Sequence, residues 1–275
     1  FAESLNIETE TRKENTMGKG YFAGIDSGST STDVVILDRE RKIVSSVIMP
    51  TGAGAANGAE RALEEALRQS GLNREDIDAV VTTGYGRTAI SDGDKSITEI
   101  TCHARGAHFL DSSVRTVVDI GGQDSKVIRL NDDGSVKNFV MNDKCAAGTG
   151  RFLEMMAKTM EMSLDELSKV GLSYQEDITI SSMCTVFAES EVVSLIAQNK
   201  ATDDIVHGLN KAVAAKTASL VKRVGGEEAY MMTGGVAQNQ GLVRTLEERL
   251  GTKLVISDKS QLCGALGAAL FAAEM

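Results

Sequence analysis

An internal repeat constrains the fold of this chain more than any other feature. Residues 21–44 and 116–141 each read as an apolar strand that ends in an aspartate, a turn of small residues, and a second strand rich in β-branched residues. Asp119 aligns with Asp26, and the turns and strands that follow align as well. A repeat of this kind predicts two related α/β halves, each built around one strand–turn–strand unit.

Helix and strand patterns alternate around both copies. A helix over 57–71, a strand over 78–86 and a helix over 96–110 follow the first copy. This order predicts an α/β half, and no low-complexity linker divides the chain. After the second copy we expect helices over 150–160, 163–171, 186–199, 202–225, 239–251 and 262–274, and strands over 177–182, 228–235 and 253–257.

Composition and charge exclude some classes of function. The 275 residues carry a formal net charge of −10, which argues against nucleic acid and anionic membranes as partners. Residues 1–16 are polar and lack the apolar core of a secretory signal, and Met17 is a plausible natural start. We therefore expect residues 1–19 to be a disordered arm or a cloning remnant, and the protein to be cytoplasmic, with its cysteines as reduced thiols.

The tips of the two repeats are the candidate phosphate-binding turns. Backbone amides at a tight glycine turn can approach oxyanions, and serine and threonine hydroxyls add donors. Asp26 and Asp119 are the expected catalytic carboxylates and would hold Mg²⁺, directly or through waters. One such turn alone would be an ordinary hairpin, but two in matched positions favour phosphate binding. The residues expected to line the phosphates are Gly28, Ser29, Thr30, Ser31, Gly121, Gly122 and Gln123.

A third glycine turn completes the candidate nucleotide site. In "MMTGGVAQNQG", residues 231–241, a strand leads into two glycines and then a helix, which suits a nucleoside and phosphate at a helix N-terminus. We expect Gly234, Gly235 and Gln238 to flank the nucleoside. In the second phosphate turn, Gln123 or Asp124 is expected to orient the attacking water.

Two cysteines lie in unusual motifs just before predicted helices. Cys145 is in "NDKCAAGTGRF" and Cys184 is in "MCTVFAESEV". A 4Fe–4S cluster needs four thiolates, and the chain has no run of closely spaced cysteines that would supply them. One chain therefore offers two plausible ligands, whereas a symmetric dimer offers four. Two buried thiols would also fit the spacing, and we interpret Cys102 and Cys263 in that way.

The order "GIDSGST", "DIGGQDSK", "MTGGVAQN" resembles the ATPase superfamily of sugar kinases, actin and the heat-shock chaperones. Within it, "TTGYGR" and the two cysteine motifs closely resemble the activators of 2-hydroxyacyl-CoA dehydratases and, in part, the ATPase subunits of benzoyl-CoA reductases. The resemblance implies an α/β fold of two ribonuclease-H-like, actin/hexokinase-type halves with a nucleotide cleft between them. Residues 20–115, with 260–275 packed back on them, would form the first half, and residues 116–259 the second.

The resemblance also implies a function. A homodimer would hold one 4Fe–4S cluster between Cys145 and Cys184 of each subunit, and Mg²⁺ with ATP or ADP would occupy the clefts. ATP hydrolysis would drive one electron from a ferredoxin or flavodoxin through this oxygen-sensitive cluster to a 2-hydroxyacyl-CoA dehydratase in an anaerobic cell. The alternatives are a sugar-type small-molecule kinase, a nucleotide sensor, and an activator of another low-potential enzyme such as benzoyl-CoA reductase.

Overall fold

The computed structural model describes residues 20–181 and 184–275, so the expectation for residues 1–19 lies outside the described chain. The chain forms two compact units. The first ends at Cys102 and resumes at Gly264, and the second contains the chain from His103 to Cys263. The division therefore falls within helix α3 (Glu99–Leu110) and at the start of helix α9 (Cys263–Ala272). The boundaries suggested by the sequence, before residues 116 and 260, remain predictions.

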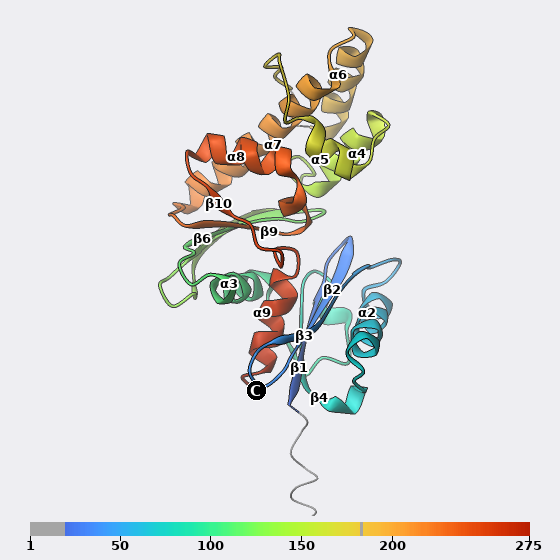
Figure 1. Cartoon of the computed structure of the whole chain (residues 1–275), viewed down its shortest axis with the longest axis vertical. Coiled ribbons are helices and arrows are strands. Elements are labelled where there is room, and N and C mark those ends of the chain that lie inside the picture. The colour runs from blue at the N-terminus through green and yellow to red at the C-terminus, as the bar shows by residue number, and fades with distance from the viewer. Residues whose placement is uncertain (1–19, 182–183) are drawn as a thin grey trace, which may run out of the picture. The chain divides into compact units, whose positions relative to one another are not determined.

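A five-stranded sheet forms the centre of the first unit (Figure 1). Its order is β3-β2-β1-β4-β5, with β1, β2 and β3 antiparallel and β4 and β5 parallel to β1. The β-branched residues of the repeat fit this pleated, buried surface, and Val34, Val35 and Ile36 are fully buried. The strands are β1 (Tyr21–Ser27), β2 (Ser31–Leu37), β3 (Ile43–Pro50), β4 (Ile77–Thr83) and β5 (Lys95–Ser96).

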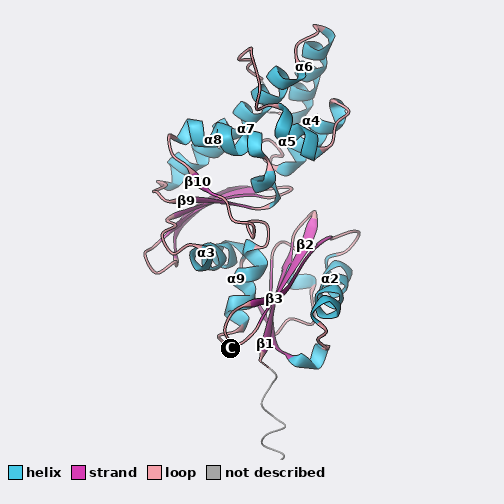
Figure 2. Ribbon diagram, in the orientation of Figure 1, coloured by secondary structure: helices cyan, strands magenta, loops and turns pink. Residues whose placement is uncertain are grey.

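Helices α2 (Ala55–Ser70) and α9 lie on opposite sides of β1, β2 and β3 in Figure 2. The buried stripe of α2 consists of small and branched residues at helical spacing, and the helix ends at Gly71 in the left-handed conformation. α9 approaches β1 so closely that a Cβ on Gly24 would lie 2.0 Å from the carbonyl oxygen of Ala265. Two short 3-10 helices, η1 (Arg74–Asp76) and η2 (Arg87–Ala89), complete the unit.

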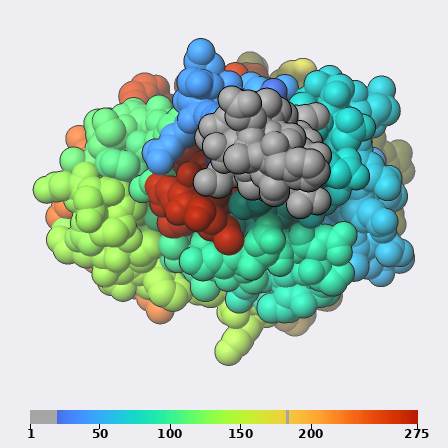
Figure 3. All heavy atoms as spheres, turned by 90° about the horizontal axis from the view of Figure 1, so that it is seen from below, coloured from blue at the N-terminus to red at the C-terminus, as the bar shows by residue number. Residues whose placement is uncertain are grey.

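Burial holds α9 in place. Figure 3 shows its C-terminal end reaching the surface beside the first strands, where Arg41 and Glu274 form an ion pair at 3.6 Å. A pair as exposed as this contributes little, whereas the side chains of Leu266 and Leu270 are fully buried. Despite the apolar character of α9, no helix within residues 20–181 and 184–275 has the length and apolarity that a membrane span requires.

The second unit repeats the topology of the first. Its sheet order, β10-β9-β6-β7-β8, read in reverse matches β3-β2-β1-β4-β5, with β6, β7 and β8 in place of the first three strands. The predicted repeat is therefore confirmed. The strands are β6 (Thr116–Ile120), β7 (Ser125–Leu130), β8 (Val136–Asn142), β9 (Tyr230–Thr233) and β10 (Leu254–Val255).

One helical core lies against this second sheet. Phe152, Leu153 and Met156 from the first helix after β8 join residues of the long helix α7 and of strands β6 and β7 in a single buried cluster. Such a cluster supplies most of the stabilisation of a unit of this size. The helices are α4 (Gly150–Thr159), α5 (Leu164–Val170), α6 (Thr185–Ala197), α7 (Thr202–Val224) and α8 (Gln240–Leu250), with the 3-10 helix η3 (Gly235–Gln238).

One predicted strand is wrong within the part of the chain that is described. Residues 177–181 form no strand, although Ile178 and Ile180 are buried. The alternation that suggested a strand arises because this segment packs its isoleucines against the core, while side chains rather than a neighbouring strand bind its backbone. The backbone amides of Gln175 and Glu176, just before this segment, donate to the side chain of Asp204. The backbone amide of Ser181 donates to the side chain of Glu191.

Replacing Gly24 by alanine tests the contact between β1 and α9. The new methyl would overlap backbone atoms of Ala265 and Ala269, which cannot move without displacing the helix. We expect Gly24→Ala to lower the free energy of unfolding by about 3 kcal/mol or more in urea titrations. Gly54→Ala is the matched control, because a Cβ there meets nothing within 4 Å, and it should cost less than about 1 kcal/mol. Equal losses would contradict this packing argument.

Candidate nucleotide site and cysteine pair

The first phosphate turn is a closed loop with open amides. The Gly28 amide donates to the Ser31 carbonyl at 2.9 Å, and Thr51 fixes the turn from β3 by donating to the carbonyls of Gly28 and Thr30. Within the described chain, the amides of Ser29 and Thr30 donate no hydrogen bond. Two adjacent unpaired amides at an exposed tip form a concavity that can bind an anion.

A second loop, the family motif "TTGYGR", supports this turn. In "TTGYGR", Gly84 has a φ of 85°, and a Cβ there would lie 2.3 Å from Oδ1 of Asp26. The Gly86 amide donates to the carbonyl of Ser27 at 2.9 Å. The glycines are therefore required because the loop packs directly on the backbone and carboxylate of the first turn.

The second phosphate turn has the same design. The Gly121 amide donates to the Asp124 carbonyl at 3.0 Å, while the amides of Gly122 and Gln123 donate no hydrogen bond in the described residues. Gly234 has a φ of 82° and lies against this turn, since a Cβ there would be 2.4 Å from the carbonyl oxygen of Ile120. The second unit thus brings together the turn and the glycine motif that the sequence assigned to the nucleoside.

Asp119 lies beneath the second turn in a network that the sequence did not predict. Thr233 donates to its Oδ1 at 2.8 Å, and Nδ1 of His103 lies 3.4 Å from the same oxygen. The ammonium of Lys126 donates to its Oδ2 at 3.0 Å and also reaches Asp124, at 2.9 Å from Oδ2. The sequence offered one signal, a lysine directly before the apolar residues Val127 and Ile128 of strand β7.

The charges around Asp119 keep it ionised. Burial alone would raise the pKa of this carboxyl, but His103, Lys126 and the Thr233 hydroxyl outweigh burial and lower the pKa to about 2. All five polar residues of this network are buried. The carboxylate is therefore a fixed negative charge under the turn at any physiological pH.

The loop that carries Cys145 is folded tightly, although Cys145 itself is exposed. Asn142 donates to the carbonyls of Cys145 and Ala147, and the hydroxyl of Thr149 donates to the carbonyl of Ala146 at 2.7 Å. Gly148 has a φ of 84°, which a side chain would strain. Bulky residues are thus excluded from this motif by its own packing.

The first turn of α4 is bonded to the second phosphate turn. The Gly150 amide donates to the Gly121 carbonyl at 2.9 Å, and the Arg151 amide donates to the Gly122 carbonyl at 2.8 Å. A Cβ on Gly150 would lie 3.1 Å from the oxygen of Gly121. Two of the amides that every helix leaves unpaired at its start are therefore satisfied by the turn itself. Cys145 is five residues away along the chain.

Cys184 is the N-cap residue of α6, and its side chain is exposed. α4 and α6 share the core of the unit, and Thr159 of α4 donates to Glu189 of α6 at 3.2 Å. The two exposed cysteines thus precede two helices that pack in one unit. Cys102 and Cys263 are fully buried, as predicted.

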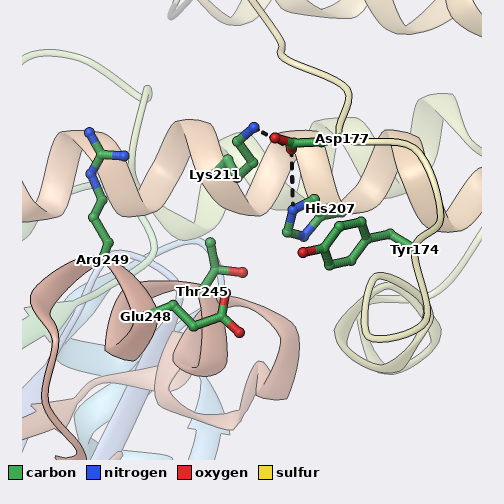
Figure 4. A pocket seen from close by; sticks show the side chains of 7 residues that line it. All are labelled: Tyr174, Asp177, His207, Lys211, Thr245, Glu248 and Arg249. Atoms are coloured by element: carbon green, nitrogen blue, oxygen red, sulfur yellow. Dashed lines mark hydrogen bonds and ion pairs between the residues drawn. The ribbon is translucent and has the colours of Figure 1, made fainter.

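Side chains around a surface pocket join residues 174–177, which precede Cys184 in the chain, to helix α7. In Figure 4 the ring of Tyr174 lies flat on that of His207, with centroids 3.4 Å apart, and Lys211 and His207 both face Asp177. Burial lowers the pKa of His207, and Asp177 only partly offsets this, which favours the neutral imidazole in the stack. None of the residues predicted for the nucleotide or the cysteine pair lines this pocket.

Solved structures with similar chain folds support the fold class. The (R)-2-hydroxyglutaryl-CoA dehydratase component A of Acidaminococcus fermentans has a TM-score of 0.90 at 44% identity, with 93% of this chain and 98% of that chain covered. A glucokinase of the ROK family from Streptomyces griseus has a TM-score of 0.58 at 15% identity and shows the fold alone. The predicted class, two actin/hexokinase-type α/β halves, is confirmed.

Sequence comparisons then give the family. A 2-hydroxyisocaproyl-CoA dehydratase activator from Clostridioides difficile is 49% identical over 252 residues, which are 92% of this chain and 94% of that protein. A solved structure of such an activator from Clostridium difficile, with bound ADPNP, has a TM-score of 0.89 at 48% identity and covers 92% of this chain and 94% of that one. The chain belongs to the BadF/BadG/BcrA/BcrD ATPase family, whose sequence profile matches residues 23–272. The resemblance recognised from the motifs is confirmed.

The ionised state of Asp119 predicts a pH dependence of stability. An aspartate with a lowered pKa binds protons more weakly in the folded than in the unfolded chain, so its stabilisation is present above about pH 4 and is lost as the pH falls toward 2. The difference in unfolding free energy between wild type and Asp119→Asn should therefore shrink by about 2 kcal/mol from pH 5 to pH 2 in urea titrations. Asp132→Asn, at an exposed carboxylate, is the control. A difference that stays constant would contradict this assignment.

Proposed function

We propose that this chain is an ATP-dependent one-electron transferase that activates a 2-hydroxyacyl-CoA dehydratase. The observation that carries the proposal is the direct bond between the start of α4 and the second phosphate turn. It joins a candidate phosphate site to the loop of an exposed cysteine, which a kinase or a simple nucleotide sensor would not need. Relatives described as dehydratase activators, similar over nine-tenths of the chain, support the same reaction.

Nucleotide binding is supported by the two turns and by the relative with bound ADPNP. We propose that each turn is a phosphate-binding element, through the open amides of Ser29 and Thr30 in the first unit and of Gly122 and Gln123 in the second. The oriented donors would bind the charged oxygens without reorganisation, which is how phosphoryl transfer is usually assisted. Gly234, Gly235 and Gln238 would flank the nucleoside, and Gln123 or Asp124 would orient the attacking water.

The cysteine pair fits a cluster shared by two subunits. A 4Fe–4S cluster needs four thiolates, and in residues 20–181 and 184–275 no group of three or more potential metal ligands comes together. Cys145 and Cys184 of one chain would supply two ligands, and a second copy the other two. Such a cluster, when bound, supplies a carrier for single electrons, and the positive start of α6 directly after Cys184 would stabilise its negative charge.

Exposed apolar side chains support a homodimer at this face. Val186 and Phe187, directly after Cys184, are 63% and 67% exposed, and Val193 and Ile196 of the same helix are also exposed. An apolar group of this kind on a helix is typical of a surface that a partner covers. The dehydratase and the ferredoxin or flavodoxin donor would also have to approach the cluster near this face. Their complexes with the homodimer would therefore be transient.

The coupling follows from the bonds at Gly150. ATP and ADP can drive a conformational change only if they bind its two states with different affinity. A γ-phosphate that displaces the peptides of Gly121 and Gly122 would pull on the amides of Gly150 and Arg151, and so shift the loop of Cys145. The alternative of a sugar-type kinase shares the fold but gives the cysteine loop no role.

The iron content of the anaerobically purified protein tests the shared cluster. We expect about four irons per dimer, since four thiolates hold each cluster, and a brown preparation that bleaches in air. Cys145→Ser should lose the iron because one ligand is missing from each subunit, whereas Cys102→Ala, at a buried thiol, should retain it. Four irons per monomer, or iron retained in Cys145→Ser, would overturn this part of the proposal.

Gly150→Ala tests the coupling. Its methyl would crowd the Gly121 carbonyl and strain the bond between α4 and the phosphate turn. We expect ATP-driven electron delivery to a dehydratase to fall about tenfold, the effect of roughly 1.4 kcal/mol, while dithionite reduces the cluster as in wild type. Hydrogen exchange of residues 145–152 should also respond less to ADPNP. Gly54→Ala, a helix N-cap glycine with open space around it, should change neither readout.

A further inference from the structure

We propose that Lys126 is the resident cation of the second phosphate turn, a positioning residue that occupies Asp119 in place of a directly bound metal ion. The inference rests on the proposed nucleotide binding, and it names which carboxylate does not ligate Mg²⁺. Lys126 would help to shape the turn, and Asp119 would contact Mg²⁺ through water rather than directly.

Both carboxylate oxygens of Asp119 already have protein partners, so a metal ion would have to compete with them. Oδ2 accepts from Lys126 at 3.0 Å, and Oδ1 accepts from Thr233 at 2.8 Å. The carboxylate is 2% exposed. Mg²⁺ requires near-ideal octahedral geometry and gives up its waters reluctantly, so direct binding to this buried carboxylate would mean displacing Lys126 or Thr233.

The position of Lys126 explains how the turn can receive a polyphosphate. Two carboxylates, Asp119 and Asp124, lie at the base of the turn, and both would repel phosphate oxygens. Lys126 lies between them: its ammonium donates to Oδ2 of Asp119 and to Oδ1 of Asp124, each at 3.0 Å, and lies 2.9 Å from Oδ2 of Asp124. It cancels one of the two charges and holds Asp124, whose carbonyl in turn closes the loop to Gly121.

The first turn differs in a way that fits this division of roles. Asp26 is half-buried, whereas Asp119 is fully buried. The register of the strands makes Asp33 the counterpart of Lys126, since Asp26 pairs with Asp33 as Asp119 pairs with Lys126. The first unit therefore carries an aspartate at the position where the second carries a lysine. Metal binding would belong to the half with Asp26.

Mn²⁺ binding without nucleotide tests the inference by a property that a merely structural lysine would not change. Removing the ammonium turns Asp119 and Asp124 into a free pair of carboxylates, which is a ligand set for a hard cation. In titrations followed by the EPR signal of free Mn²⁺, Lys126→Met should bind Mn²⁺ at least about tenfold more tightly than wild type. Adding Asp124→Asn to Lys126→Met should remove the gain.

Lys200→Met is the matched control, because Lys200 also pairs with a carboxylate, Glu176 at 2.7 Å, but at the surface. It should bind Mn²⁺ as wild type does. In the presence of ADP, Asp119→Asn should retain the affinity for Mn²⁺·ADP within about threefold, since Asp119 is not a direct ligand. A folded Lys126→Met without tighter Mn²⁺ binding, or an Asp119→Asn that loses more than about thirtyfold in Mn²⁺·ADP affinity, would overturn the inference.

A measurement on wild type decides the question if Lys126→Met does not fold. Crystals with Mn²⁺·ADP should show the anomalous signal of Mn²⁺ away from Asp119, with Lys126 still bonded to its carboxylate. Mn²⁺ bound directly to an Asp119 oxygen, at about 2.0–2.2 Å, would overturn the proposal. Failure of wild type to bind Mn²⁺·ADP at all would instead overturn the proposed function, while the nucleotide-free titration would still decide the role of Lys126.

Discussion

The second unit depends on one constraint: the peptides of a phosphate turn also serve as hydrogen-bond acceptors for a helix. Every helix begins with amides that need partners outside it, and most find side-chain caps or water. α4 uses the carbonyls of Gly121 and Gly122 instead. The turn and the helix consequently share one backbone conformation, and the glycine-rich loop before α4 is as small as it is because the two backbones meet there.

The buried charges under the same turn make its shape costly to change. A carboxylate without solvent is stable only when its partners stay in place, and removing one partner of a buried pair typically costs several kcal/mol. Asp119 has three such partners from three elements, α3, β7 and β9. The network thereby ties the turn to the middle of the sheet.

The sequence predicted the fold correctly where local chemistry decides structure, and it named the turns that the structure describes as the candidate site. Matched strand–turn–strand units and glycine turns have strong local signals, so the two sheets, nearly all helices and the confirmed family followed from them. The strand expected over 177–182 failed because Ile178 and Ile180 alternate in the same way when an irregular segment packs on a helix. The network of Lys126, His103 and Thr233 could not be predicted, since its members come from distant parts of the chain and meet only in the folded unit.

The place of α9 affects how the protein is made. The first unit takes its strands from residues 21–96 but its second helical layer from residues 264–275, which follow the whole second unit, and Gly24 of β1 leaves room for Ala265. During synthesis the early sheet emerges with one face uncovered, and it stays so until the ribosome has finished the whole second unit. Apolar strand surface exposed for that long favours aggregation. Substitutions in residues 264–275 should therefore lower the yield of folded protein, even though these residues lie far from both candidate phosphate turns in the sequence.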